Sequence, residues 1–81
     1  MSENSTPLMR ITRHQGFTIY LTGEQRVAGW FPQYQIFRDG QPVTALRINF
    51  FHSLNNPELA CDIAFDMARE DIRLQLFDLD E

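Results

Sequence analysis

The 81-residue chain contains no lysine, only one cysteine and no long apolar run. A single cysteine excludes an internal disulfide, and a lone thiol without a secretory signal is typical of a reducing cytoplasm, where we expect the protein. Without a stretch of about 20 apolar residues, no membrane-spanning helix is predicted. The net charge of −4, with arginine as the only strong cation, disfavours nucleic acid as a partner, because phosphate binding needs clustered positive charge.

Residues with metal-binding or catalytic chemistry are sparse as well. His14, His52 and Cys61 lack the paired short spacings of a zinc site, so we expect no metal and no cofactor, and Cys61 is expected in the core. No phosphate-binding glycine motif or catalytic triad is present, which favours a protein that is not an enzyme. A row of carboxylates at four-residue spacing is predicted as a solvated helix face or a dock for a basic partner: Glu58, Asp62, Asp66 and Glu70.

The chain divides into a predicted disordered tail (1–7), one α+β domain (8–76) and an acidic tail (77–81). From residue 9 to 21 the apolar residues fall on odd positions, which predicts strand structure with one buried face. Gly16 either bends a single strand over 9–22 or splits it into a hairpin, and residues 23–29 are predicted as a loop. The end, "LQLFDLDE", is compatible with frayed helix, added strand or mobile tail.

The segment "YQIFRDGQPVTALRINF" contains an Asp-Gly pair that allows two hairpin registers. A two-residue turn places Tyr34 and Ile36 on the opposite face of the sheet from the apolar residues that follow. A three-residue loop, with Gly40 as a bulge, places six large residues on one face: Trp30, Tyr34, Ile36, Leu46, Ile48 and Phe50. Burying three or four of them, at about 1.5–3 kcal/mol each, outweighs a turn preference of about 1 kcal/mol, so we predict the bulged register.

The sequence "NPEL" predicts the start of a helix, with Asn56 as the N-cap, Pro57 in the first position and Glu58 in the first turn. Apolar residues then recur at helical spacing: Ala60, Ile63, Ala64, Met67 and Ala68, widened by Cys61 and Phe65. Asp71 falls on this apolar side, so we predict that the helix leaves the sheet near Ile72. The element order predicts an α+β fold, a three- or four-stranded antiparallel sheet with one C-terminal amphipathic helix packed on one face.

One short helix covers only one face of such a sheet, and the other face meets water or a partner. The predicted register turns Tyr20 outward from the first strand, together with residues 31, 33, 35 and 37 and with residues 43, 45, 47 and 49. Exposed aromatic residues and arginine are enriched at interfaces. The candidate partner-binding residues are therefore Tyr20, Phe31, Phe37, Arg38 and Arg47.

These features predict a small protein-interaction domain, or a homodimer, that uses the open sheet face or the acidic helix. The alternative is weak nucleic-acid binding by the same sheet face, with aromatic side chains stacking on bases. A purely structural interpretation is that Tyr20 and Phe37 stiffen the sheet as cross-strand partners.

Three strands followed by one amphipathic helix, over about residues 17–72, resemble the plant AP2 domain and the amino-terminal arm-binding domains of phage-type integrases. The resemblance implies nucleic-acid binding by the strands; those domains carry many basic residues there, and here Arg26, Arg38 and Arg47 are the nearest. The pattern "HQGFTI…GW…YQI…G", followed by "LACDIAFDMAREDI", is also similar to small bacterial proteins of unknown function, which implies no activity.

Overall fold

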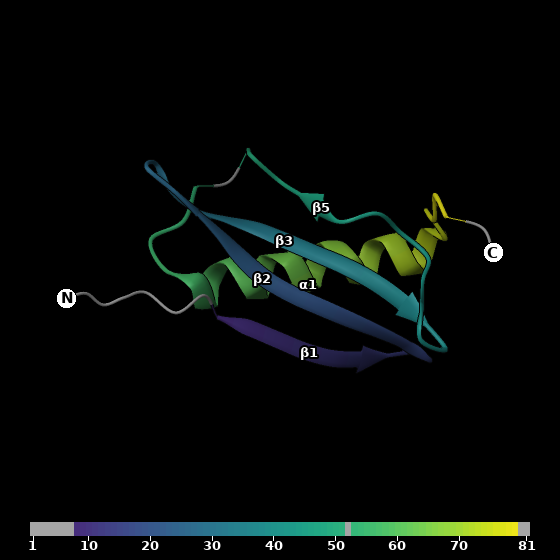
Figure 1. Cartoon of the computed structure of the whole chain (residues 1–81). Helices are drawn as coiled ribbons and strands as arrows, with labels where there is room; N and C mark the ends of the chain where they lie inside the picture. Colours follow the sequence, from purple (N-terminus) through teal and green to yellow (C-terminus); the bar gives the residue numbers. More distant parts are fainter. Residues whose placement is uncertain (1–7, 52, 80–81) are drawn as a thin grey trace.

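The computed structural model describes residues 8–51 and 53–79. One antiparallel sheet contains β1 (Met9–His14), β2 (Phe17–Arg26), β3 (Gly29–Arg38), β4 (Gln41–Pro42) and β5 (Arg47–Ile48). Strands β1 to β4 are neighbours in that order, and β5 pairs with β3. The helix α1 (Pro57–Leu74) crosses one face against β2 and β3, and the described residues place no element on the other face (Figure 1). The predicted α+β architecture is confirmed.

Residues 9–22 form a hairpin rather than one bent strand. Gln15 and Gly16, with φ of 53° and 85°, make the two-residue turn, and two left-handed residues in succession are typical of type I′. The turn pairs Ile11 with Tyr20, so odd residues of β1 share a face with even residues of β2. The prediction of one buried odd-numbered face is therefore wrong for β1, whose Met9 and Ile11 point away from the helix.

Strands β2 and β3 pair without interruption as far as Arg26 and Gly29, so the predicted loop over 23–29 is wrong except at its tip. Gly23 lies within β2, where the helix begins to cross it. A Cβ atom at this position would lie 3.1 Å from the Cβ of Ala60 and 3.2 Å from the ring of Trp30. The glycine therefore permits a close approach of helix and sheet and makes no turn.

The hairpin between β3 and β4 also has a two-residue turn, and the predicted three-residue bulged loop is wrong. Asp39 and Gly40 have φ of 53° and 79°, and Arg38 pairs with Gln41, as a type I′ turn requires. Burial does not select the register here, because Leu46 and Phe50 stay exposed and do not join the core. The strand β4 itself ends at Pro42.

Between β4 and β5 the chain stops pairing with β3, and when pairing resumes its register relative to β3 has shifted by two residues; we call this shift the slip. The hairpin register would set Tyr34 opposite Ala45, whereas Tyr34 pairs with Arg47. Thr44 is fully buried in this slip, and its Oγ1 accepts a hydrogen bond of 3.2 Å from the N–H of Ile36. The threonine thus replaces a ladder partner, so a buried N–H is not left unsatisfied.

The two-residue turn reverses the faces expected for residues 43–50, and the later gain of two residues keeps them reversed, because side chains alternate with a period of two. Leu46 and Phe50 are 52% and 54% exposed, and Ile48 pairs with Gln33 on the face away from the helix. Val43, predicted to point outward, is buried in the core. Of the six residues predicted to share the covered face, Trp30, Tyr34 and Ile36 lie on the helix side, the last two of them buried, and Leu46, Ile48 and Phe50 are not buried there.

Both ends of α1 follow the predicted local chemistry. The side chain of Asn56 accepts a backbone hydrogen bond of 2.9 Å from the first turn, Pro57 occupies the first position and Glu58 follows it. The helix ends at Gln75, whose left-handed backbone (φ 55°) lets its N–H reach two carbonyls of the last turn. The predicted helix start is confirmed.

The buried stripe of α1 consists mainly of small side chains, which let the helix lie close to the sheet: Ala60, Cys61, Ala64, Ala68 and Ile72. They pack on four residues of the two central strands: Ile19, Leu21, Tyr34 and Ile36. Ile72 is 5% exposed, so the prediction that the helix leaves the sheet near this residue is wrong. Cys61 is buried in the core, as predicted, and its burial raises the pKa of the thiol.

After the helix, residues 76–79 run back along the segment that follows β4. The ring of Phe77 packs on that of Phe17 at a centroid distance of 5.2 Å, and the N–H of Leu79 donates to the Val43 carbonyl at 3.1 Å. These contacts lie at the start of the segment predicted as an acidic tail. They join the C-terminal residues to the part of the core beside the β3–β4 hairpin. The predicted disordered tail, residues 1–7, lies outside the described residues.

Candidate functional site

The face of the sheet away from α1 is the largest candidate surface, and we call it the open face. Because paired residues of neighbouring strands share a face, its members follow from the observed registers. They are Met9, Ile11 and Arg13 of β1; Thr18, Tyr20, Thr22, Glu24 and Arg26 of β2; Gly29, Phe31, Gln33, Gln35 and Phe37 of β3; Pro42 of β4; and Ile48 of β5.

The apolar part of the open face lies across β1, β2 and β3. Met9 and Ile11 are 55% and 56% exposed, and Ile11 lies directly opposite Tyr20, which is itself 38% exposed. The rings of Tyr20 and Phe37 lie 4.8 Å apart at 40°. Two of the predicted partner-binding residues are thus brought together, beside two apolar residues that the sequence analysis had assigned to the core.

Phe31, a third predicted site residue, also lies on the open face but is only 8% exposed. Its ring meets that of Phe50 edge-on at 5.4 Å, and the guanidinium of Arg26 lies 5.1 Å above the Phe50 ring. Phe50, 54% exposed, is therefore the accessible aromatic residue at this end of the sheet. Sequence reasoning missed Phe50 because the predicted register had placed it under the helix.

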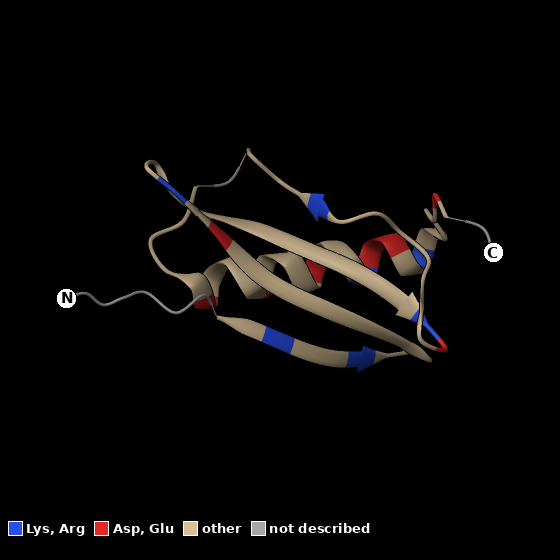
Figure 2. Cartoon of the chain, in the orientation of Figure 1, with Lys and Arg blue, Asp and Glu red and all other residues tan. Residues whose placement is uncertain are grey.

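Few positions along β1, β2 and β3 are charged (Figure 2), and the registers place only some of these on the open face. Glu24 forms an ion pair of 3.0 Å with Arg26 at the end of β2. Arg13 takes part in no ion pair with the described residues. The strand β3 carries no charged residue before Arg38. The open face therefore combines exposed apolar area with one arginine available to a partner.

Arg47, the fourth predicted site residue, lies on the helix side. Its guanidinium forms ion pairs with Asp71 at 2.7 Å and Asp78 at 3.3 Å, and donates to the Leu76 carbonyl at 2.8 Å. The prediction that it points outward is wrong, because the two-residue turn at Asp39-Gly40 turns it inward. The same pairing explains how Asp71 is accommodated on the apolar side of the helix.

Tyr34 completes this polar cluster. Its hydroxyl donates to the same Asp71 carboxylate that binds Arg47. Burial, and then the neighbouring carboxylate, raise the pKa of Tyr34 to about 12, because both disfavour the phenolate. A phenol with this pKa stays protonated at neutral pH and does not suit proton abstraction there. The cluster joins β3, β5, α1 and the C-terminal segment, which is a structural role.

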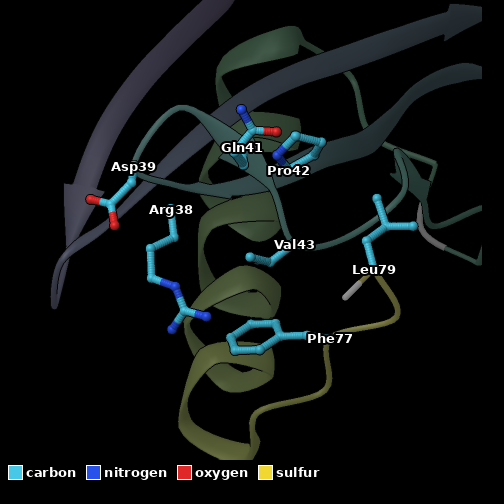
Figure 3. Close-up of a pocket in the computed structure, with 7 residues that line it drawn as sticks. All are labelled: Arg38, Asp39, Gln41, Pro42, Val43, Phe77 and Leu79. Carbon is cyan, nitrogen blue, oxygen red and sulfur yellow. The ribbon is translucent and has the colours of Figure 1, made fainter. Parts of the chain in front are cut away.

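Arg38, the fifth predicted site residue, also lies on the helix side, at the end of β3. Its guanidinium lies 5.3 Å above the ring of Phe17. It borders a hollow of about 750 Å³ between the β3–β4 hairpin and the C-terminal segment. Figure 3 shows Arg38 extending toward Phe77, with Val43 beside them and Asp39 pointing away. A cation beside apolar walls could accept a small organic anion, but this guanidinium already packs on an aromatic ring of the core.

The acidic row of α1 is largely neutralised by arginines of the same chain. Asp62 pairs with Arg10 of β1 at 2.9 Å, and Asp66 pairs with Arg69 one turn along the helix at 2.7 Å. Glu70 pairs with Arg73, which holds the pKa of that carboxyl below its usual value. The helix is therefore a weaker candidate than the open face for docking a basic partner.

Two of the three side chains considered as metal ligands in the sequence analysis lie within the described residues. His14 packs edge-on against the ring of Phe65 at 5.9 Å, Cys61 is buried, and His52 lies outside the described residues. In residues 8–51 and 53–79, no group of three or more His, Cys, Asp or Glu side chains is arranged to hold a metal ion. Over the same residues, no helix has the length and apolar character needed to cross a membrane.

Comparison of the chain with protein-family models, with curated proteins and with solved structures found no match. The resemblances based on element order and short sequence patterns therefore stay predictions. The exposed apolar side chains and the few charges of the open face are therefore the basis for a proposal of function.

Proposed function

We propose that this protein is a protein-interaction domain whose open face binds another protein. The observation that carries the proposal is the group of exposed apolar side chains of Met9, Ile11 and Tyr20 on a face with little charge. Removing a large apolar side chain from water contributes about 1.5–3 kcal/mol when burial is complete, and roughly half of that is still available at Met9 and Ile11.

The partner that fits this face presents an apolar patch bordered by a carboxylate. The patch would cover Ile11 and Tyr20, and the carboxylate would meet Arg13, which has no ion-pair partner in the described chain. Aromatic residues and arginine at the margin of an apolar centre are common features of protein interfaces.

The positions of the arginines weigh against nucleic acid as the ligand. Arg47 is held by two aspartates, Arg10 by Asp62, and Arg38 lies on the helix side. A phosphate backbone would therefore find few cations beside the stacked rings of the open face.

Photo-crosslinking from the two sides of the domain tests the proposal. A benzophenone amino acid replaces Ile11 on the open face or Asp66 on the exposed side of α1 in otherwise identical chains. We expect one defined protein other than this chain to be crosslinked from position 11 and not from position 66, and Tyr20→Glu to reduce that product.

The crosslinked protein is then purified and titrated into the isotope-labelled domain. Amide shifts confined to the open-face strands, together with at least tenfold weaker binding by Tyr20→Glu, would support the proposal. Shifts centred on α1, equal crosslinking from both positions, or products removed by nuclease would overturn it.

A further inference from the structure

Within residues 8–51 and 53–79, the strand β1 is a free edge of the sheet over its whole length. It stands at one end of the strand order and, among these residues, pairs with β2 alone. The opposite edge is made of two-residue strands, and the intervening segment already uses backbone groups of Val43 and Ala45 for hydrogen bonds to residues 78 and 79. Among the described residues, β1 therefore offers the long unpaired row of backbone groups.

The hairpin turn decides which backbone groups of β1 point outward. In a two-residue hairpin the flanking residues, here His14 and Phe17, exchange both hydrogen bonds, and such pairs then alternate with unbonded pairs. The N–H and C=O groups of Met9, Ile11 and Arg13 accordingly point away from β2. The free edge thus has three residues, each with one donor and one acceptor.

We propose that β1 pairs antiparallel with β1 of a second copy, with the two-fold axis at Ile11. Antiparallel pairing matches outward residues with outward residues, and only this register uses all three of them on each strand. Ile11 then faces Ile11 of the second copy, and Met9 faces Arg13. The pairing forms an isologous dimer with a continuous sheet across its axis.

The side chains suit this register. The two Ile11 side chains, each 56% exposed in the single chain, would cover one another. Arg13 lies opposite Met9, so no like charges meet on the open face. On the helix side Arg10 lies opposite Thr12 and is already held by Asp62 of its own chain at 2.9 Å. The edge also contains no proline, which natural proteins often use to block such pairing.

This inference goes beyond the proposed function, because it concerns the edge of the sheet and requires no other protein. The dimer joins two open faces side by side into one surface. One pair of strands is a small interface, so we expect a dissociation constant of about micromolar rather than nanomolar order.

Sedimentation equilibrium of the purified full chain, over low to high micromolar concentration, is the first test. We expect a monomer–dimer equilibrium that Ile11→Pro shifts fully to monomer, because proline removes an N–H that only the dimer uses. Circular dichroism checks that this variant stays folded. Tyr20→Glu, on the same face but one strand inward, should remain dimeric while losing binding of the other protein, which separates the two proposals.

Two substitutions of one residue then test the register. Met9→Glu places a carboxylate opposite Arg13 of the second copy, and Met9→Lys places a like charge there, while Thr22, its partner within the chain, is neutral. With two such pairs in each dimer, we expect Met9→Glu to tighten the dimer roughly two- to thirtyfold and Met9→Lys to weaken it comparably. A chain that stays monomeric at high micromolar concentration, or a dimer indifferent to Ile11→Pro or to the charge at residue 9, would overturn the inference.

Discussion

The two faces of the sheet are built from the same strands but differ in what their side chains contact. The covered face carries Ile19, Leu21 and Ile36, all nearly inaccessible, against a stripe of small helix residues. The open face carries residues of similar size, Met9 and Ile11, more than half exposed. The difference shows that an apolar side chain in a strand of this protein is not necessarily a core residue. A helix that covers one face decides which of two apolar surfaces is core and which is available.

The largest expected effect compares one isoleucine from each face. Ile36→Ala should lower the free energy of unfolding by about 2–5 kcal/mol, because it leaves a cavity beneath the helix. Ile11→Ala, its matched control, should cost less than about 1 kcal/mol, because water already reaches that side chain. Urea denaturation measures both. Equal losses would show that the open face is covered in solution.

A smaller effect compares two aspartates of α1. Asp71→Ala should cost about 1–3 kcal/mol, because it leaves the half-buried guanidinium of Arg47 and the Tyr34 hydroxyl without their shared acceptor. Asp66→Ala breaks only an exposed pair with Arg69 and should cost less than about 0.5 kcal/mol. Thermal and urea unfolding give the comparison, and a similar cost for the two variants would contradict the assignment of the polar cluster.

The smallest effect concerns alkaline pH. Folding raises the pKa of Tyr34 from 10.0 to about 12, so between these values the unfolded chain has lost a proton that the folded chain keeps. The free energy of unfolding should therefore fall as pH rises through this window. Tyr34→Phe should lessen that fall. An identical pH profile for wild type and Tyr34→Phe would exclude this role.

Local sequence signals predicted the fold class and the helix correctly. The assumed strand registers placed several side chains on the wrong face of the sheet. The start of α1 follows from "NPEL", whose hydrogen bonds lie within a few residues of one another. Tyr20, Phe31 and Phe37 were correctly predicted to point away from the helix. Met9 and Ile11 were misassigned because one pattern was extended through a turn, although the Gln-Gly pair at 15–16 was the signal that could have indicated the change of face.

Arg47 and Phe50 were misassigned for a different reason. Their side-chain direction follows from the two-residue turn at Asp39-Gly40, where a three-residue loop was predicted. The sequence does not announce the gain of two residues between β4 and β5, which leaves the faces unchanged but sets Arg47 rather than Ala45 opposite Tyr34. The slip is stabilised by groups far along the chain: Asp71 and Asp78 bind Arg47, and Leu79 bonds the Val43 carbonyl. Such partners become neighbours only when the helix has packed.

The amino-acid sequence by itself determined the elements whose stabilising contacts are close along the chain, namely two glycine-containing turns, alternating strands and a capped amphipathic helix. The tertiary structure alone decided which of the two faces α1 covers, and which residues lie opposite Gln33 and Tyr34 after the chain leaves β4. The physical reason is that a shift of two residues between strands keeps every side chain on its face and changes little locally, and only the packing of α1 and the C-terminal segment makes one register more stable than the other.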